Sequence, residues 1–233
     1  MQPALQFVSF VVGVSLFILV LFAMLRGPWR RYPFVFLYVL GDFVTTLLEV
    51  RPAIKYDTIS AAEKKSYLIL YYWDERVMQV LLFLLVISMI YQASAHLKSR
   101  LVLVGGAIVG VLLYAGITFF IYYKPNIQMG LWMTPWRRNL NFSAAILDMG
   151  LWALLIGARK KDYRLLMISG ALGIQFTAGA IGQAFSYLAR SSVHWTGYLI
   201  ALANLACLYI FWQAFRTPDE AVEPAVEEER RLK

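Results

Sequence analysis

Five acidic residues lie inside or at the ends of stretches that are otherwise apolar enough to span a membrane: Asp42, Glu49, Asp74, Glu75 and Asp148. An ionisable side chain at the centre of a hydrocarbon layer costs about 2.5–3.5 kcal/mol, so it usually faces the interior of a helix bundle or a water-filled cavity. Residues of this kind often bind ions or relay protons. These five acids are therefore the first candidates for a functional site.

The second apolar stretch carries a line of polar residues. Tyr38, Asp42, Thr45 and Glu49 are spaced four, three and four residues apart, which places them on one face of a helix. A polar face on a membrane helix must contact protein or water, and this favours a polar pocket. Asp42 equally fits a structural role, in which a neutral carboxyl group hydrogen-bonds a neighbouring helix.

The third apolar stretch begins with three aromatic residues, followed at once by Asp74-Glu75-Arg76. On a helix Arg76 lies on the same face as Tyr72, so we predict that it neutralises Glu49 or Asp42 on the adjacent helix. The alternative is that the aromatic residues belong to the interfacial belt and the charges lie at the level of the lipid headgroups. The sequence leaves both interpretations open.

Asp148 lies near the middle of the fifth apolar stretch. Asn141 precedes it by seven residues and Trp152 follows it by four, so all three share a helix face. A carboxyl group at this depth is predicted to face the interior, where it binds a cation, relays a proton or accepts a hydrogen bond. Asn204 is the central polar residue of the last stretch, and we expect it to hydrogen-bond a neighbouring helix.

Together these residues predict one polar intramembrane pocket that binds a ligand. Its expected lining residues are Tyr38, Asp42, Glu49, Tyr72, Glu75, Arg76 and Asp148. The apolar stretches contain no lysine, which excludes a retinal Schiff base, and the two histidines fall at opposite membrane faces, which excludes paired haem ligation.

Motifs for catalysis are absent from the sequence, including the phosphate-binding glycine loop, Gly-x-Ser-x-Gly and His-Glu-x-x-His. We therefore predict no catalytic residue, no metal site and no cofactor. A Mg²⁺ site with carboxylate ligands from Asp42, Glu49 and Asp74 or Glu75 stays open as an alternative, although these residues lack a regular multi-carboxylate spacing.

Lines of small residues lie on the fourth and sixth stretches and predict close helix packing. They are Gly106 and Gly110; Ser169, Gly173 and Thr177; and Gln175, Gly179, Gly182 and Ser186. The connection from Lys124 to Arg138 contains Trp132 and Trp136. We interpret it as a loop with aromatic anchors at the membrane surface, the alternative being a cap over the mouth of the bundle.

The elements that position these residues are predicted to be entirely helical. Of the 233 residues, 60% are hydrophobic and 15% are charged, against about 45–50% and about 25% in soluble domains. Seven apolar stretches recur, at about 4–25, 34–50, 68–93, 101–123, 140–158, 165–189 and 195–215. The predicted fold class is all-α, a polytopic membrane protein with seven transmembrane helices.

One membrane domain, residues 1–216, is followed by a charged tail, 217–233, that is too polar to fold alone. Ser60 and Glu63 form a capping box, which predicts that the third helix begins before the membrane. Cys207 is the single cysteine, so it cannot form an internal disulfide and is predicted to be a small buried residue.

Lysine and arginine residues set the orientation. Ten of those in short connections fall on one side and eight on the other, and the dense clusters at 26–31 and 159–164 mark the first side as cytoplasmic. This predicts an outer N-terminus and an inner C-terminus. The net charge of +8 is explained by these connections, which contact anionic lipid, so nucleic acid is not an expected partner.

Three short segments carry a family resemblance: Tyr-Tyr-Trp-Asp-Glu (71–75), Arg-Arg-Asn-Leu (137–140) and Tyr-Arg-Leu-Leu-Met-Ile-Ser-Gly-Ala-Leu-Gly (163–173). With the layout of the spans, the chain resembles a group of small, uncharacterised seven-helix bacterial membrane proteins. The resemblance implies the same topology and a location in the bacterial inner membrane. It implies no activity.

The leading hypothesis for function is a non-enzymatic inner-membrane protein. It is either an accessory or anchoring subunit of a membrane complex or a small-ligand sensor with a polar pocket, so its expected partners are the lipid bilayer, a protein or a small molecule or cation. Two alternatives remain open. One is a proton- or cation-coupled transporter, and the other is a lipid-modifying enzyme that uses paired carboxyl groups.

Overall fold

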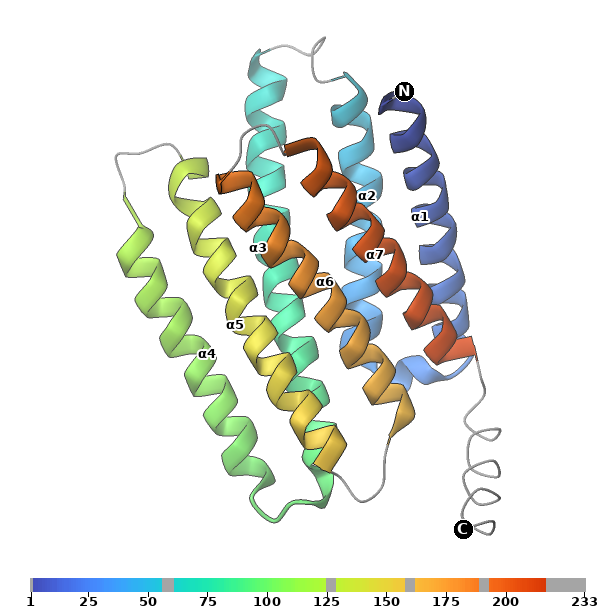
Figure 1. Ribbon diagram of the computed structural model, residues 1–233, viewed down its shortest axis with the longest axis vertical. Coiled ribbons are helices and arrows are strands. Elements are labelled where there is room, and N and C mark those ends of the chain that lie inside the picture. Colours follow the sequence, from blue (N-terminus) through green and yellow to red (C-terminus); the bar gives the residue numbers. More distant parts are fainter. Residues whose placement is uncertain (1, 56–60, 125–128, 158–161, 189–192, 217–233) are drawn as a thin grey trace.

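The computed structural model of the chain describes residues 2–55, 61–124, 129–157, 162–188 and 193–216 (Figure 1). In these ranges the chain is built from helices and contains no strand. The α-helices are α1 (Gln2–Leu25), α2 (Pro33–Lys55), α3 (Ala61–Ala93), α4 (Arg100–Tyr122), α5 (Met129–Gly157), α6 (Tyr163–Leu188) and α7 (Val193–Arg216). Two short 3-10 turns, η1 (Pro28–Arg30) and η2 (Ser94–His96), lie in the connections. The all-α prediction is confirmed.

Five of the helices contain a segment long and apolar enough to cross a membrane, among the residues that the structure describes. These segments are Ile69–Ala93, Arg100–Tyr122, Arg138–Gly157, Tyr163–Gly182 and Gly197–Arg216. The apolar parts of α1 and α2, Ser9–Leu25 and Pro33–Leu48, are shorter. The chain is therefore compatible with an integral membrane protein, and the predicted count of seven spans stays a prediction.

Six of the seven helices form a closed ring in cross-section, and α4 lies outside it. Around the ring each helix packs on the next in the order α1, α2, α3, α5, α6, α7 and back to α1. α4 packs on the outside of α3 and α5. Successive helices run in opposite directions, so the N-terminal end of α1 and the C-terminal end of α7 lie at opposite ends of the bundle (Figure 1).

The hydrophobic core lies inside the ring and draws on all six of its helices. Its most enclosed side chains include Val20, Val39, Leu85, Leu151 and Leu172, each at most 1% exposed. The buried side chains of α4 are Val111 and Thr118, and much of the rest of that helix is exposed. Burial thus separates α4 from the ring.

A close approach between α2 and α3 depends on a glycine. A methyl group at Gly41 would lie 3.0 Å from the sulfur of Met78 and 3.2 Å from a methyl carbon of Leu81. Both distances are shorter than ordinary van der Waals contact, so the side chains of Met78 and Leu81 would have to shift to admit a methyl group at position 41. The glycine therefore allows close contact between α3 and the helix that carries Tyr38 and Asp42.

The start of α5 differs from the sequence prediction. Met129–Arg138 was expected to belong to a loop but forms the first turns of α5, with Pro135 inside the helix. Trp132 is 8% exposed, and its ring packs edge-on against Phe119 and Tyr123 of the α4 end, with centroids 5.7 and 5.2 Å apart. The indole N–H of Trp136 donates to the carbonyl of Ala115 at 3.3 Å. The loop prediction is wrong here because packing against α4 stabilises Trp132 and Trp136 more than anchoring at the membrane surface would, and a helical α5 provides that packing.

Helix α3 is long enough to extend beyond one side of a membrane. Its 33 residues correspond to about 50 Å, whereas the hydrocarbon layer is about 30 Å thick. The helix begins eight residues before its apolar segment Ile69–Ala93. This agrees with a helix that starts outside the membrane. Ser60 of the predicted capping box and the tail 217–233 lie outside the described residues.

Candidate functional site

The buried polar contacts of the bundle converge on α6. This helix lies between α5 and α7 in the ring and faces α2 across it. Its side chains contact polar groups on those three helices. We call the set the polar core and define it as Tyr38, Asp148, Ser169, Gln175, Asn204 and Cys207.

Asp148 of α5 is the buried acid of this set, with 3% of its surface exposed. One carboxyl oxygen, Oδ1, accepts a hydrogen bond of 2.7 Å from the hydroxyl of Ser169. The other, Oδ2, lies where α6 carries Gly173, and a methyl group on that glycine would be 3.2 Å away from it. The prediction that Asp148 faces the interior is confirmed. Gly173 leaves the space that the carboxyl group fills.

No lysine or arginine in the described ranges forms an ion pair with Asp148. A charge on this carboxyl group is therefore costly, and the single hydrogen bond from Ser169 offsets only part of the cost. The rest of this cost would be offset by a proton, by a cation or by a hydrogen-bond donor of a ligand at the carboxyl group. Trp152, which shares the helix face, packs on α6 with its ring 3.6 Å from the position of a methyl group on Gly170.

Gln175 connects three helices through one side-chain amide. Its Nε2 donates to the hydroxyl of Tyr38 on α2 at 3.2 Å and to Oδ1 of Asn204 on α7 at 3.1 Å. Its Oε1 accepts a weak hydrogen bond from the thiol of Cys207 at 3.5 Å. Because α2 and α6 lie on opposite sides of the ring, the bond to Tyr38 passes through the interior of the ring.

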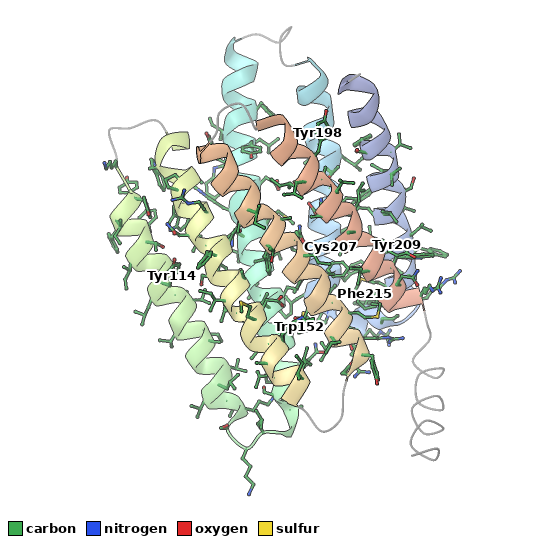
Figure 2. The ribbon with its side chains drawn as sticks, viewed as in Figure 1. Tyr114, Trp152, Tyr198, Cys207, Tyr209 and Phe215 are labelled. Carbon is green, nitrogen blue, oxygen red and sulfur yellow. The ribbon has the colours of Figure 1, made fainter. Side chains whose placement is uncertain are left out.

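Two predictions about single residues are confirmed by these contacts. Asn204 hydrogen-bonds a neighbouring helix, and Cys207 is buried, with 2% of its surface exposed. Figure 2 places Cys207 about midway along α7, above Phe215 near the end of the same helix. Gln175 was assigned only to a packing line. The available signal was its amide, which has two donors and an acceptor and needs partners in an apolar bundle.

Asp42 lies one helical turn after Tyr38 and is half-buried. Its backbone carbonyl accepts hydrogen bonds from the hydroxyls of Thr45 at 3.0 Å and Thr46 at 2.7 Å. Both threonine hydroxyls therefore donate within their own helix. The two acids Asp42 and Asp148 lie on different helices, α2 and α5.

The remaining predicted site residues lie on α3, and their contacts lead away from the polar core. Tyr72 is half-buried, with its ring edge-on to that of Tyr71 at 5.7 Å. The guanidinium of Arg76 lies 5.0 Å from the ring centre of Trp73 and donates to the sulfur of Met133 on α5 at 3.5 Å. The side chains of Glu49 and Glu75 lie outside the described residues. Neutralisation of Asp42 or Glu49 by Arg76 stays a prediction.

No three side chains of the types His, Cys, Asp and Glu lie close enough to hold a metal ion within the described part of the chain. The suggested Mg²⁺ ligands Glu49 and Glu75 fall outside it. The polar core supplies a carboxyl group, two hydroxyls, two amides and a thiol from four helices. These groups can bind a small polar molecule or a cation by hydrogen bonds and charge.

Comparison of the chain with protein-family models, with curated proteins and with solved structures finds no match.

Proposed function

We propose that the chain is a seven-span protein of the bacterial inner membrane with its N-terminus outside and its C-terminus in the cytoplasm. The alternation of helix directions supports an odd number of crossings (Figure 1). The described ranges carry seven basic residues at each end of the bundle, so the orientation depends on the dense clusters of the sequence at 26–31 and 159–164.

Within this protein the ring of six helices acts as a sensor for a small polar or cationic ligand. The single observation that carries this proposal is the buried carboxyl group of Asp148, which accepts one described hydrogen bond and has no described basic partner. A ligand that donates hydrogen bonds or carries positive charge would remove this deficit. Asp148 is therefore the proposed ligand anchor.

The rest of the polar core explains how binding would be transmitted. Gln175 holds α2, α6 and α7 together through one amide. A ligand that exchanged any of these hydrogen bonds would change the relative stability of two arrangements of the helices. A ligand shifts such an equilibrium only by its difference in affinity for the two states, and contacts to four helices provide that difference.

An accessory or anchoring subunit of a larger complex is the second candidate, and α4 favours it. This helix lies outside the ring and exposes large apolar side chains such as Leu101, at 80%, and Phe120, at 82%. Either lipid or a neighbouring protein can cover such a face. The same chain can bind a ligand and belong to a complex, so the two candidates differ in what accompanies the purified protein.

A proton- or cation-coupled transporter is the third candidate, favoured by the intramembrane acid Asp148. Transporters commonly bind their substrates at broken helices. Here α6 runs unbroken through Gly170, Gly173 and Gly179, which favours the sensor over the transporter. A lipid-modifying enzyme would need two neighbouring carboxyl groups, one of them with an unusual affinity for protons.

The first experiment is native mass spectrometry of the protein gently extracted from its own membrane. A discrete small molecule bound to a single chain supports the sensor, and its loss in Asp148→Asn places it at the anchor. A stoichiometric protein partner supports the subunit instead. If Asp148→Asn and Asp42→Asn leave both bound molecules and bound proteins unchanged, the proposed ligand site is wrong.

Cys207 provides a second readout without any mutation. Because it is the single cysteine and is buried in the polar core, its rate of reaction with a maleimide reports opening of the ring. A ligand that acts through Gln175 is expected to change this rate severalfold. Tyr209→Phe is a matched control, because the Tyr209 hydroxyl contacts Gln213 on the outer part of the same helix. It should leave the response to ligand intact.

A further inference from the structure

Three arginines gather where α1 and α7 end. The two helices run parallel and pack along their length, with Gly13 next to Leu205, so Arg26 and Arg216 lie at the same level. Gly27, at a positive φ of 152°, ends α1 and lets the chain turn into η1, which carries Arg30. We call Arg26, Arg30 and Arg216 the α1–α7 arginine patch.

Each guanidinium group of the patch lies over an aromatic ring. The distances to the ring centres are 4.4 Å from Arg26 to Phe22, 5.7 Å from Arg30 to Trp29 and 5.3 Å from Arg216 to Trp212. Such cation–π contacts restrict the side chains while leaving the N–H groups able to donate. The patch is therefore ordered before any partner binds.

The charges of the patch have no acidic partner among the described residues, unlike that of the next arginine in the chain. Arg31 forms an ion pair of 3.0 Å with Asp162, the residue that caps α6 through hydrogen bonds to the amides of Arg164 and Leu165. This pair and the ring contact between Tyr32 and Phe215 at 5.7 Å hold the connection in place. The patch keeps three exposed positive charges at one corner.

Exposed apolar side chains border the patch on α1. They include Ile18 at 53%, Phe22 at 56% and Leu25 at 58% exposure. A soluble anion would contact only the guanidinium groups. A phospholipid would place its phosphate on the arginines and its acyl chains along α1, so it fits both parts of the surface.

We propose that the α1–α7 arginine patch binds the headgroup of an anionic phospholipid. The inference is independent of the proposed ligand site, because it uses none of the residues of the polar core. The carbonyl ends of α1 and α7 also lie at this corner and disfavour an anion. Binding must then come from the guanidinium groups, and their removal is a decisive test.

The test uses the full chain in nanodiscs of phosphatidylcholine with a minor fraction of phosphatidylglycerol, followed by native mass spectrometry of retained lipid. Arg26→Gln/Arg216→Gln removes two charges of the patch. The matched control is Lys98→Gln/Arg100→Gln, which removes two charges at the same end of the bundle, where Arg100 lies 3.3 Å from the ring centre of Tyr91. Unchanged thermal unfolding verifies that both variants are folded.

The unmodified chain is expected to retain phosphatidylglycerol in preference to phosphatidylcholine. A basic residue near a membrane surface contributes about five-fold to the binding of anionic lipid, so the patch variant should lose about 25-fold of this preference. The control should lose about three-fold or less, because Arg100 is half-buried and already donates to the backbone carbonyl of Tyr91 at 2.9 Å. Arg26→Lys/Arg216→Lys keeps the charge and should recover most of the preference.

Equal losses in the patch variant and the control would overturn the proposal, as would no loss in either. The segment 217–229, which follows Arg216, contains six acidic residues and no basic one, so it is the competing occupant. A chain truncated after Arg216 distinguishes the lipid headgroup from the acidic segment as the occupant of the patch. A preference that appears only after truncation would mean that the acidic segment occupies the patch in the full chain, and the proposal would be wrong.

Discussion

Helices α6 and α4 carry the same kind of sequence pattern but lie in opposite environments. Both contain glycines at helical spacing within apolar segments. On α6, Gly170 and Gly173 have side chains of α5 within 3.6 and 3.2 Å of the positions where methyl groups would be. On α4, Gly106 and Gly110 have no such neighbour within 4 Å among the described residues. Glycine spacing alone therefore does not decide which helix packs closely.

The difference between the two helices lies in their polar side chains. α6 carries Ser169 and Gln175, whose hydroxyl and amide need partners inside an apolar layer, and each finds one on another helix. On α4 the hydroxyl of Thr118 donates to the carbonyl of Tyr114 in its own helix at 2.7 Å. Since lipid tails are as apolar as leucine, polar partners and close fit drive helix association in a membrane. α6 has both.

The largest effect is expected where a side chain is added to the packed glycine of α6. Gly173→Leu would displace the carboxyl group of Asp148 and separate α5 from α6, with a loss of about 3 kcal/mol in the free energy of unfolding. Gly106→Leu on α4 is the control and should raise it by about 0.8 kcal/mol, because leucine favours a helix over glycine and no described neighbour lies within 4 Å of that position. Equilibrium unfolding in mixed micelles measures both, and similar losses would contradict the comparison.

Removal of an enclosed apolar side chain should have the next largest effect. Leu172 of α6 is 0% exposed, so Leu172→Ala leaves a cavity and should lower the free energy of unfolding by about 2 kcal/mol. Leu112 of α4 is 65% exposed, and Leu112→Ala should cost less than about 0.5 kcal/mol in the isolated chain. The same micelle titration applies.

A large cost for Leu112→Ala would contradict the peripheral position of α4 in a single chain. If that cost appeared only at high protein concentration, it would indicate that α4 packs against a second molecule. This outcome would favour the subunit over the sensor. Leu113→Ala, at a neighbouring position of 60% exposure, repeats the test on the same helix.

The sequence predicted the helices and the interior position of Asp148 for a simple physical reason. Apolar runs specify helices in lipid because every backbone polar group must be satisfied within its own segment. A carboxyl group near the middle of such a run must face inwards. Both inferences depend only on local sequence and on the properties of the solvent.

The arrangement of the helices could not be predicted in the same way. The hydrogen bond between Tyr38 and Gln175 joins residues 137 positions apart in the sequence. The position of α4 outside the ring depends on which helix faces meet, which local sequence does not specify. The packing of the aromatic side chains of Trp132 and Trp136 on α4 also explains why α5 begins at Met129, earlier than predicted. The described contacts of Arg76 are Trp73 and Met133, and its neutralisation of an acid on α2 stays a prediction.

A smaller effect is expected from Gln175→Leu, which removes the amide that connects three helices. Hydrogen bonds between side chains of membrane helices contribute about 0.6 kcal/mol each, so the loss of three should be about 1.8 kcal/mol. Tyr38→Phe removes one of these bonds and should cost about 0.6 kcal/mol. Equal effects of the two substitutions would mean that Asn204 and Cys207 gain nothing from the amide.

The smallest effect is expected from Ser169→Ala, which removes the described donor to Asp148. A double-mutant cycle of Ser169→Ala with Asp148→Leu, which removes the acceptor at similar volume, isolates the energy of this hydrogen bond from other changes at the two positions. We expect a coupling free energy of about 0.6 kcal/mol, the average for such bonds in membrane helices.

The size of this coupling distinguishes two forms of the proposed ligand anchor. Hydrogen bonds to a charged group contribute about 1.5–3 kcal/mol, so a coupling in that range would mean that Asp148 is ionised. A coupling near zero would mean that Ser169 does not act on the carboxyl group, and α6 would then differ from α4 by close fit alone. The cycle therefore tests whether polar contact or packing makes α6 the centre of the bundle.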